Sequence, residues 1–306
     1  MQFFNFGISH CFSMFVSPRR KYLLLSYKHY IIMKIAKNAI LGSALVGGLF
    51  MASCQPQEEV SVNNIPGHVL EALAANGFST NDVVNYEAGY LVEGDIYMTE
   101  DQIMNFGGGH TINEQYRTTN LVNAGGGRNI TMYANQGGRN GYSAGMIAGL
   151  DLAIQRYNDE NLSITFSRLS SGGSEDITMT RLKKGDERRG VLGSAGFPTA
   201  SGDPHNEIKM SGILESSYGL STEGIATIIA HEMGHCIGFR HTDYFDRSIS
   251  CGGGTSNEGA STVGAIHIPG TPTGASASAK SFMLACTDGS DRPFNNDDKT
   301  ALNYMY

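Results

Sequence analysis

The spacing of hydrophobic and polar positions changes along the chain and predicts an alternation of strands and helices. Between residues 143 and 157, apolar side chains recur every three to four positions, as on one face of an amphipathic helix. A second helix is expected from about Ser221, and a short final helix over 297–304 with Asn296 as its cap. Short apolar or alternating runs predict strands at 129–134, 162–166, 177–179 and 207–210. This order of elements favours an α+β fold.

A smaller set of elements is expected upstream, over about 60–115. A short helix is predicted at 68–76 and a second at 99–106, with Thr99 as its cap. The strands expected between them lie at 83–84, 90–92 and 95–98, around glycine turns. Two stretches rich in small and turn-forming residues, 190–206 and 250–280, are expected to be long loops.

The N-terminus has the pattern of an export signal. Lys34 and Lys37 precede an apolar run that is too short to span a bilayer comfortably, and Cys54 follows it. The segment 33–53 resembles a bacterial lipoprotein signal, with Cys54 as the lipidated residue and Met33 as the initiator, so residues 1–32 are interpreted as an extension upstream of the true start. The alternative is an ordinary secretory signal in which Cys54 is incidental. The expected location is therefore the outer membrane or cell surface as a lipoprotein, or otherwise the secreted fraction.

Composition narrows the classes of function. The chain has 306 residues, 41% of them hydrophobic, so it can bury a sizeable core. Its formal net charge of -7 provides no basic stripe for phosphates, so a nucleic-acid partner is not expected. Charged residues make up only 17%, and the 39 glycines favour a loop-rich, exported protein. Membrane contact is expected only through the N-terminal lipid anchor, and the protein is expected to be a monomer.

The chemistry is concentrated in an HExxH motif at the end of the second predicted helix. His231 and His235 are four residues apart and share one helix face, so both can bind one zinc ion. Gly238 follows where the helix should stop, and it allows the chain to turn and bring back His241 as a third ligand. Three protein ligands and a water define one catalytic zinc ion, with Glu232 pointing toward the open position. The competing interpretation is a surface helix with satisfied histidines, but the apolar run 225–230 predicts a buried helix, where unpaired histidines would be costly.

The extended motif HExxHxxGxxH resembles the zinc signature of the metzincin metallopeptidases, and the chain is similar to the bacterial dual-action HEIGH metallopeptidases. The resemblance covers about 90–306, with Met233 where that family usually has Ile. It implies a twisted mixed sheet with an active-site helix and a backing helix, and an irregular C-terminal subdomain ending in a helix. It also implies that Met283 is the Met-turn residue. The matching stretches are 116–120, 195–198, 235–244 and 267–272.

The resemblance divides the chain into a tether and candidate propeptide over 54–115 and a metzincin-like zinc peptidase domain over 116–306. The expected reaction is endoproteolysis, in which Glu232 acts as general base on a zinc-bound water. An extended peptide or protein substrate is expected to pair with an exposed edge strand at 207–211, for which a plain sheet edge is the alternative interpretation. The competing functions are a surface lipoprotein binding module that retains a zinc fold without peptidase activity, and a zinc hydrolase of non-peptide amides.

The segment 92–96 is similar to the FxGD segment of astacin propeptides, and this implies that Asp95 is a latency ligand of the zinc. The alternative is that Gly94 and Asp95 form only a hairpin turn. Natural substrate, cleavage specificity, calcium binding and removal of residues 54–115 are left open by the sequence.

Other polar residues near the motif are assigned smaller roles. Tyr244 is expected to pack under the loop rather than to assist at the oxyanion, and Asp243 either hydrogen-bonds a zinc histidine or caps the turn. His205 and His267 are expected to be loop residues, because three histidines already supply the ligands. Ala285 stands where astacin-like metzincins have a Tyr ligand.

Three cysteines fall in the expected folded part, and the simplest arrangement is one disulfide and one buried thiol. We predict a disulfide between Cys251 and Cys286, because it would tie the glycine-rich loop to the base of the site just after the Met-turn. Its stabilisation would be roughly 3–4 kcal/mol on the chain-entropy model. Cys236 is then reduced and packed within the helix beside a zinc ligand.

Overall fold

The computed structural model describes residues 64–106, 116–138, 140–253, 266–272 and 275–306, and from Ile65 onward these belong to one structural unit. The predicted extension, the lipoprotein signal and Cys54 lie outside the described residues. Among the residues described, no helix is long and apolar enough to cross a membrane.

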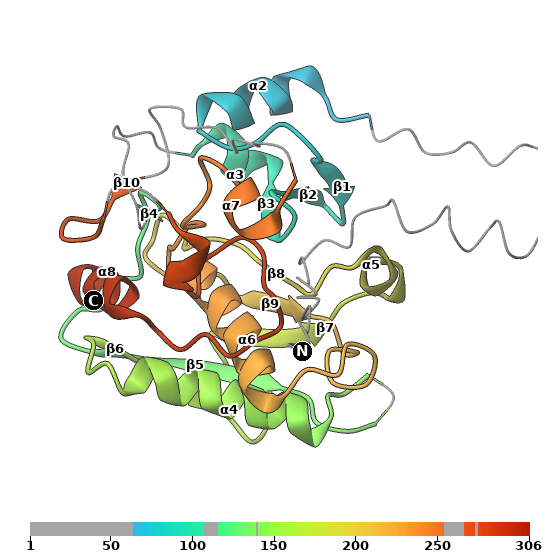
Figure 1. Ribbon diagram of the computed structural model, residues 1–306, viewed down its shortest axis with the longest axis vertical. Helices are drawn as coiled ribbons and strands as arrows, with labels where there is room; N and C mark the ends of the chain where they lie inside the picture. Colours follow the sequence, from blue (N-terminus) through green and yellow to red (C-terminus); the bar gives the residue numbers. More distant parts are fainter. Residues whose placement is uncertain (1–63, 107–115, 139, 254–265, 273–274) are drawn as a thin grey trace, which may run out of the picture. The chain divides into compact units, whose positions relative to one another are not determined.

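An eight-stranded mixed sheet runs through this unit (Figure 1). In sheet order, its strands are β1 (Val84–Tyr86), β2 (Gly89–Val92), β3 (Ile96–Thr99), β8 (Gly193–Ala195), β9 (Glu207–Met210), β7 (Ile177–Arg181), β5 (Arg128–Ala134) and β6 (Ile164–Arg168). The last four strands of this order are parallel to one another, whereas β8 is antiparallel to β9. Strand β3 pairs in parallel with β8 through Ile96 and Ala195, so the N-terminal elements extend the same sheet.

Two long helices pack against each other and against the parallel strands. Both α4 (Ala144–Asn158) and α6 (Thr222–Cys236) begin at a serine whose side chain accepts a hydrogen bond from the first turn. Gly149 of α4 allows close approach, since a Cβ there would overlap the side chain of Ile225. Apolar residues of both helices and of β5, β6 and β7 form one large core.

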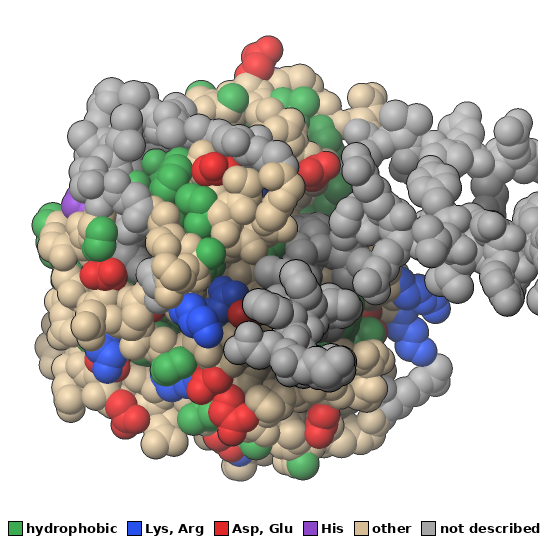
Figure 2. Space-filling view, viewed as in Figure 1, with side chains coloured by type: hydrophobic (Ala, Val, Ile, Leu, Met, Phe, Trp, Pro, Cys, Tyr) green, Lys and Arg blue, Asp and Glu red, His purple; other side chains and the backbone are tan. Residues whose placement is uncertain are grey.

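The remaining elements surround this frame. They are α2 (Gly67–Ala75), α3 (Glu100–Met104), β4 (Tyr116–Arg117), α5 (Lys184–Arg189), α7 (Ser248–Cys251), β10 (Ile266–His267), the 3₁₀ turn η2 (Ala277–Ala279) and α8 (Asn296–Met305). Strands β4 and β10 form a separate antiparallel pair. Helices α2 and α3 pack with β2 and β3 around a second core that includes Phe197. On the face seen in Figure 2, acidic and basic side chains are interspersed.

The structure confirms the α+β class, the mixed sheet, the active-site and backing helices and the C-terminal helix. Thr99 caps α3 through a capping box, as expected, whereas α8 is capped by Asn295 and not by Asn296.

The expected loop 190–206 contains β8, which the sequence pattern missed because three small residues carry no alternation. Strand β8 lies beside β9 in the sheet, so the prediction that 207–211 is an exposed edge was wrong.

Candidate metal centre

Helix α6 carries the first half of the site in its last two turns. His231 and His235 are fully buried, and their Nε2 atoms are 3.1 Å apart. The two side chains lie side by side because residues four apart occupy the same face of an α-helix. The buried apolar turn that precedes them anchors the helix in the core, so the two imidazoles are held in a fixed position.

A sharp turn after α6 brings in the third histidine. Gly238 has a positive φ of 109°, a conformation that favours glycine. The turn is held to β4, because Thr118 N donates to Gly238 O at 2.8 Å and Arg240 N donates to Tyr116 O at 2.8 Å. The ring of His241 is thereby centred 5.0 Å from that of His235.

The outer nitrogens of the two helical histidines determine which atoms face the centre. Nδ1 of His231 donates to the carbonyl of Phe282, and Nδ1 of His235 donates to the carbonyl of Phe239, each at 2.8 Å. The Nε2 atoms therefore face each other with their lone pairs. A bound cation satisfies both lone pairs at once, so this donor set fits a metal ion.

Asp95 completes a group of four buried donors. One donor atom from each of Asp95, His231, His235 and His241 lies within 4.8 Å of the others. Oδ2 of Asp95 is 3.2 Å from His241 Nε2 and 3.5 Å from His231 Nε2. The structure thus places the carboxylate that was predicted as a latency ligand among the three predicted histidine ligands.

Burial and mutual charge shift the protonation of this cluster. Burial lowers the pKa of His235, and the neighbouring His231 and His241 lower it further. For Asp95, burial favours the neutral acid, but His241 and the other two histidines outweigh it and hold the pKa well below its usual range. The cluster therefore favours neutral imidazole at His235 and an ionised carboxylate, which are the forms that bind metal.

Glu232 lies beside the donors without belonging to them. It is fully buried, and within the described part of the chain neither of its carboxylate oxygens has a hydrogen-bond partner. Burial raises its pKa well above the usual value, and the charge of Asp95 raises it further. Gly193 of β8 makes room for this side chain, because a Cβ there would overlap Oε1 of Glu232.

Met283 lies under α6, where the Met-turn was expected. Its side chain is fully buried, and a Cβ at Gly234 would overlap its sulfur. Its carbonyl accepts from Thr242 N at 2.8 Å, which joins this turn to the loop of the third histidine. On the other side, Asp298 of α8 accepts hydrogen bonds from Ser281 Oγ at 2.6 Å and Phe282 N at 3.3 Å. Helix α8 therefore helps to position the floor of the site.

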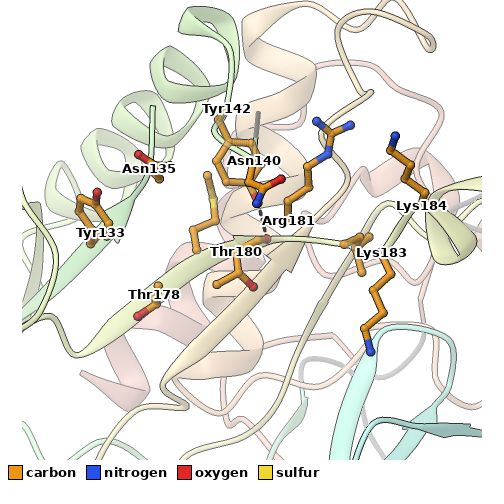
Figure 3. A pocket seen from close by; sticks show the side chains of 11 residues that line it. Tyr133, Asn135, Asn140, Tyr142, Thr178, Thr180, Arg181, Lys183 and Lys184 are labelled. Atoms are coloured by element: carbon orange, nitrogen blue, oxygen red, sulfur yellow. Dashed lines mark hydrogen bonds between the residues drawn. The ribbon is translucent and has the colours of Figure 1, made fainter. Parts of the chain in front are cut away.

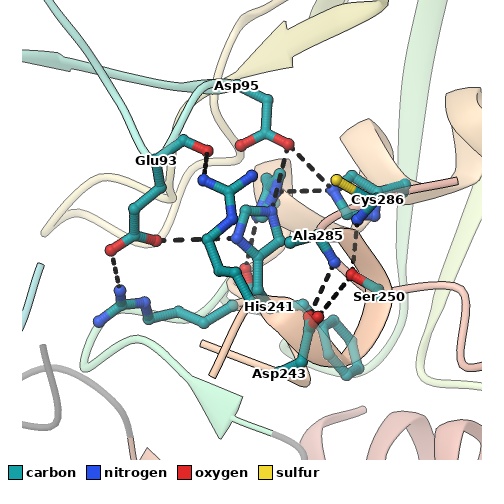
Figure 4. A network of polar contacts seen from close by, with 12 residues as sticks. Glu93, Asp95, His241, Asp243, Ser250, Ala285 and Cys286 are labelled. Atoms are coloured by element: carbon teal, nitrogen blue, oxygen red, sulfur yellow. Dashed lines mark hydrogen bonds and ion pairs between the residues drawn. The ribbon is translucent and has the colours of Figure 1, made fainter. Parts of the chain in front are cut away.

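Asp243 links the histidine loop to the segment after Met283 (Figure 4). Its carboxylate accepts from Ala285 N at 2.8 Å and from Ser250 Oγ at 2.5 Å, and no contact with the histidine cluster is found among the described residues. Cys251 and Cys286 form a disulfide in the same place, whereas Cys236 is a buried free thiol. Of the two roles considered for Asp243, the observed contacts fit the stabilisation of the turn.

The other aromatic and histidine candidates lie outside the donor group. Tyr244 packs edge-to-face on Tyr116, with ring centroids 4.3 Å apart, as expected for a packing residue. His267 lies in β10 and contacts Thr271, and the ring of His205 is tilted against that of Tyr97, with centroids 6.3 Å apart.

A cavity of about 510 Å³ is lined by residues of β5 and β7 and by neighbouring polar side chains, and none of the four donors lines it (Figure 3).

Three residues of the site escaped the sequence analysis. Glu93 contacts the cluster from the segment that carries Asp95, with Oε2 3.7 Å from His241 Nδ1. Arg240 pairs with Glu93, and Gly193 faces Glu232. Glu93 and Asp95 lie in the turn between β2 and β3, in which Glu93 and Gly94 have positive φ angles, so no alternation of side chains along a strand indicated Glu93.

Helix α6 packs against a mixed sheet and presents buried histidines that can bind a metal. The adjacent Glu232 is buried beside these histidines and is not one of the donors. This combination places the chain among the metallopeptidases. The model of the family described as dual-action HEIGH metallo-peptidase matches residues 90–306, so the chain belongs to that family. A search of curated proteins found no match to the chain. The family match begins inside the segment predicted as a tether and candidate propeptide, and it includes Glu93 and Asp95.

Proposed function

We propose that the protein is a zinc-dependent endopeptidase. The observation that carries this proposal is the position of Glu232 beside three convergent histidines, buried and outside the donor set. Three imidazole nitrogens suit zinc, and a site with three such ligands leaves one position for substrate or water. A bound zinc ion would lower the pKa of water and polarise the scissile carbonyl.

The chain's own residues supply the proton transfers. Glu232, as a carboxylate, accepts a proton from the attacking water and then transfers it to the leaving amine. Burial raises the pKa of the Glu232 carboxyl above its usual value, and a raised pKa favours the return of the proton to the leaving amine. Nδ1 of His231 and Nδ1 of His235 each donate to a backbone carbonyl, so in the neutral imidazole Nε2 carries the lone pair that can bind a metal.

The substrate would pair with β8 in place of β3. The edge of β8 next to Glu232 is covered by residues 95–99, through the Ile96–Ala195 pair and the hydrogen bond from Ala195 N to Asp95 O at 2.9 Å. We therefore propose that residues 65–106 keep the enzyme latent, with Asp95 as the latency ligand. Loss of the Asp95 contact opens the metal position, and movement of the segment away from β8 lets this strand accept an extended peptide by β-augmentation.

The proposed location is the cell surface or outer membrane, through a lipid on Cys54, with secretion of the processed chain as the other route. The sequence pattern over 33–53 supports this proposal. Labelling with a radioactive fatty acid should mark the wild-type chain and leave a Cys54→Ser variant unmarked.

The central experiment compares wild type with Glu232→Ala on an unfolded protein substrate, after limited proteolysis of both and with and without a chelator. We expect the wild type to cleave, the chelator to stop it, and Glu232→Ala to lose 10²–10⁴-fold in rate, as for a lost general base, at one zinc per chain. Glu223→Ala, which changes an exposed glutamate of the same helix, is the control and should cleave normally. A Glu232→Ala variant with wild-type turnover would disprove the assignment.

The alternatives make different predictions in the same assay. A surface binding module with a retained zinc fold would bind metal and cleave nothing at any stage of processing. A zinc hydrolase of non-peptide amides would release amines from small amides and leave unfolded protein intact. The buried Glu232, with no structural partner in the described residues, favours the peptidase over the binding module.

A further inference from the structure

Arg240 is a fully buried cation directly before the third histidine of the metal centre. Its guanidinium donates to Glu93 Oε1 at 2.7 Å and to Gly77 O at 3.0 Å, and it lies 4.1 Å from the ring centre of Phe78. These three partners belong to residues 65–106, and the guanidinium also lies 5.7 Å from the ring centre of Tyr244. The ion pair with Glu93 is fully buried, so loss of this carboxylate is costly and a carboxylate that takes its place is favoured.

A second guanidinium from the catalytic part meets the same residue. Arg247 Nη1 donates to the carbonyl oxygen of Glu93 at 2.8 Å, while Arg240 binds its side chain. The two guanidinium groups therefore bind one glutamate at two places, Arg240 at the carboxylate and Arg247 at the main-chain carbonyl. Such a pair of contacts can recognise a peptide that carries an acidic side chain.

The contacts of Arg240 and Arg247 with Glu93 lie close to the metal centre (Figure 4). Glu93 Oε2 is 3.7 Å from Nδ1 of His241, and Asp95, two residues further along, reaches the donors. Residues 93–95 form the turn between β2 and β3, in which Glu93 has a φ of 52° and Gly94 a φ of 95°. A peptide carboxylate bound in the place of the Glu93 side chain would therefore lie beside the third histidine of the metal centre.

We propose that Arg240 and Arg247 form a subsite for a peptide carboxylate, and that the activated enzyme prefers an acidic side chain at one fixed position near the scissile bond. Glu93 occupies this subsite in the latent chain. The proposal rests on the proposed peptidase function and adds a specificity to it. A free C-terminal carboxylate has the same chemistry, and the experiment separates the two sources.

The test uses the full chain with Glu93→Ala and Asp95→Ala, which removes both acidic contacts of the segment. Neutral ten-residue peptides, each with one Glu moved to a different position, are compared with their Gln counterparts in kcat/KM. The same labelled peptides are bound to the zinc-loaded chain that also carries Glu232→Ala, with fluorescence anisotropy as the readout. A second set carries Gln throughout, with either a free C-terminal carboxylate or an amide.

We expect one Glu position to raise kcat/KM and affinity roughly 10–100-fold over Gln, the range of a charged hydrogen bond. Arg240→Met should abolish this preference and Arg240→Glu should reverse it in favour of Lys. Arg240→Lys retains the positive charge and should keep part of the preference for Glu over Gln. This variant provides the test if Arg240→Met folds poorly. Arg168→Met is the matched control. It removes an arginine of strand β6 that pairs with Asp151, and it should leave the preference unchanged.

Equal values for Glu and Gln at every position, failure of every peptide to bind, or a preference unaffected by Arg240 changes would each overturn the subsite. A preference for the free C-terminal carboxylate alone would overturn the side-chain assignment. Cleavage without acidic preference would reject the subsite and leave the peptidase proposal intact. Glu-selective binding that depends on Arg240, without cleavage, would support the subsite and count against the peptidase.

Discussion

The carboxylate of Asp95 lies 3.2 Å from Nε2 of His241, although 146 residues separate them in the chain. This contact joins the N-terminal segment to the donor set at the position that a substrate or water would need. The neighbouring strand pair β3–β8 places the same segment along the sheet beside Glu232. The N-terminal segment and a substrate are therefore expected to compete for the same place, so the chain is latent while the segment occupies it.

Asp95→Ala should raise the activity of the uncut chain, because it removes the carboxylate that competes for the open position. We expect at least a tenfold increase over uncut wild type, measured as initial rates on a fluorogenic peptide, with gel analysis to show that no cleavage has occurred. Asp101→Ala, an exposed aspartate of α3, is the control. Equal rates for uncut wild type and uncut Asp95→Ala would end the latency hypothesis.

His241→Ala should weaken metal binding, because it removes one of three histidine ligands from the proposed zinc site. At least a tenfold loss of zinc affinity is expected from competition with a chromophoric chelator. His267→Ala serves as control, since this histidine contacts Thr271 and is not part of the donor group found among the described residues. Unchanged affinity in His241→Ala would show that the metal, if bound, uses other ligands.

Gly193→Ala should impair catalysis more than metal binding. The new Cβ would overlap Oε1 of Glu232 and displace the carboxylate, and the three atoms nearest to this Cβ all belong to Glu232. In the Asp95→Ala background we expect at least a tenfold lower kcat at normal zinc content. Gly126→Ala, where a Cβ meets nothing within 4 Å, is the control and should leave both properties unchanged. Wild-type kcat in Gly193→Ala would refute the role of this glycine.

His205 should make the folded state less stable in mild acid. Burial lowers its pKa to about 4, against the opposing charge of Glu207 and with a smaller contribution from the charge of Lys209. Between this value and the pKa of about 6.5 of an unfolded histidine, the unfolded chain binds more protons, so stability falls as pH decreases through this window. Because the ring is partly exposed, we expect a contribution of about 1–2 kcal/mol between pH 7 and pH 5. Chemical denaturation at both pH values should show a smaller difference for His205→Gln than for wild type, and identical differences would contradict this account.

The sequence by itself determined the elements with strong local signals. The period of apolar residues located α4 and α6, and Ser143 and Ser221 cap them because a serine oxygen can accept from the free N–H groups of the first turn. The spacing of His231, Glu232 and His235 likewise followed from helix geometry alone. The turn at Gly238 made His241 a candidate, since a positive φ there costs glycine little.

Only the tertiary structure decided where distant segments meet. Strand β8 consists of three small residues, so its place between β3 and β9 depends on backbone hydrogen bonds that no periodicity records. For the same reason, β9 looked like an edge strand in the sequence and lies inside the sheet. The contacts of Arg240 with Glu93 and of Gly193 with Glu232 join residues far apart in sequence, and charge or size alone does not specify a partner. The sequence pattern identified the histidine donors, whereas the packing of the N-terminal segment against the sheet placed Asp95 beside them.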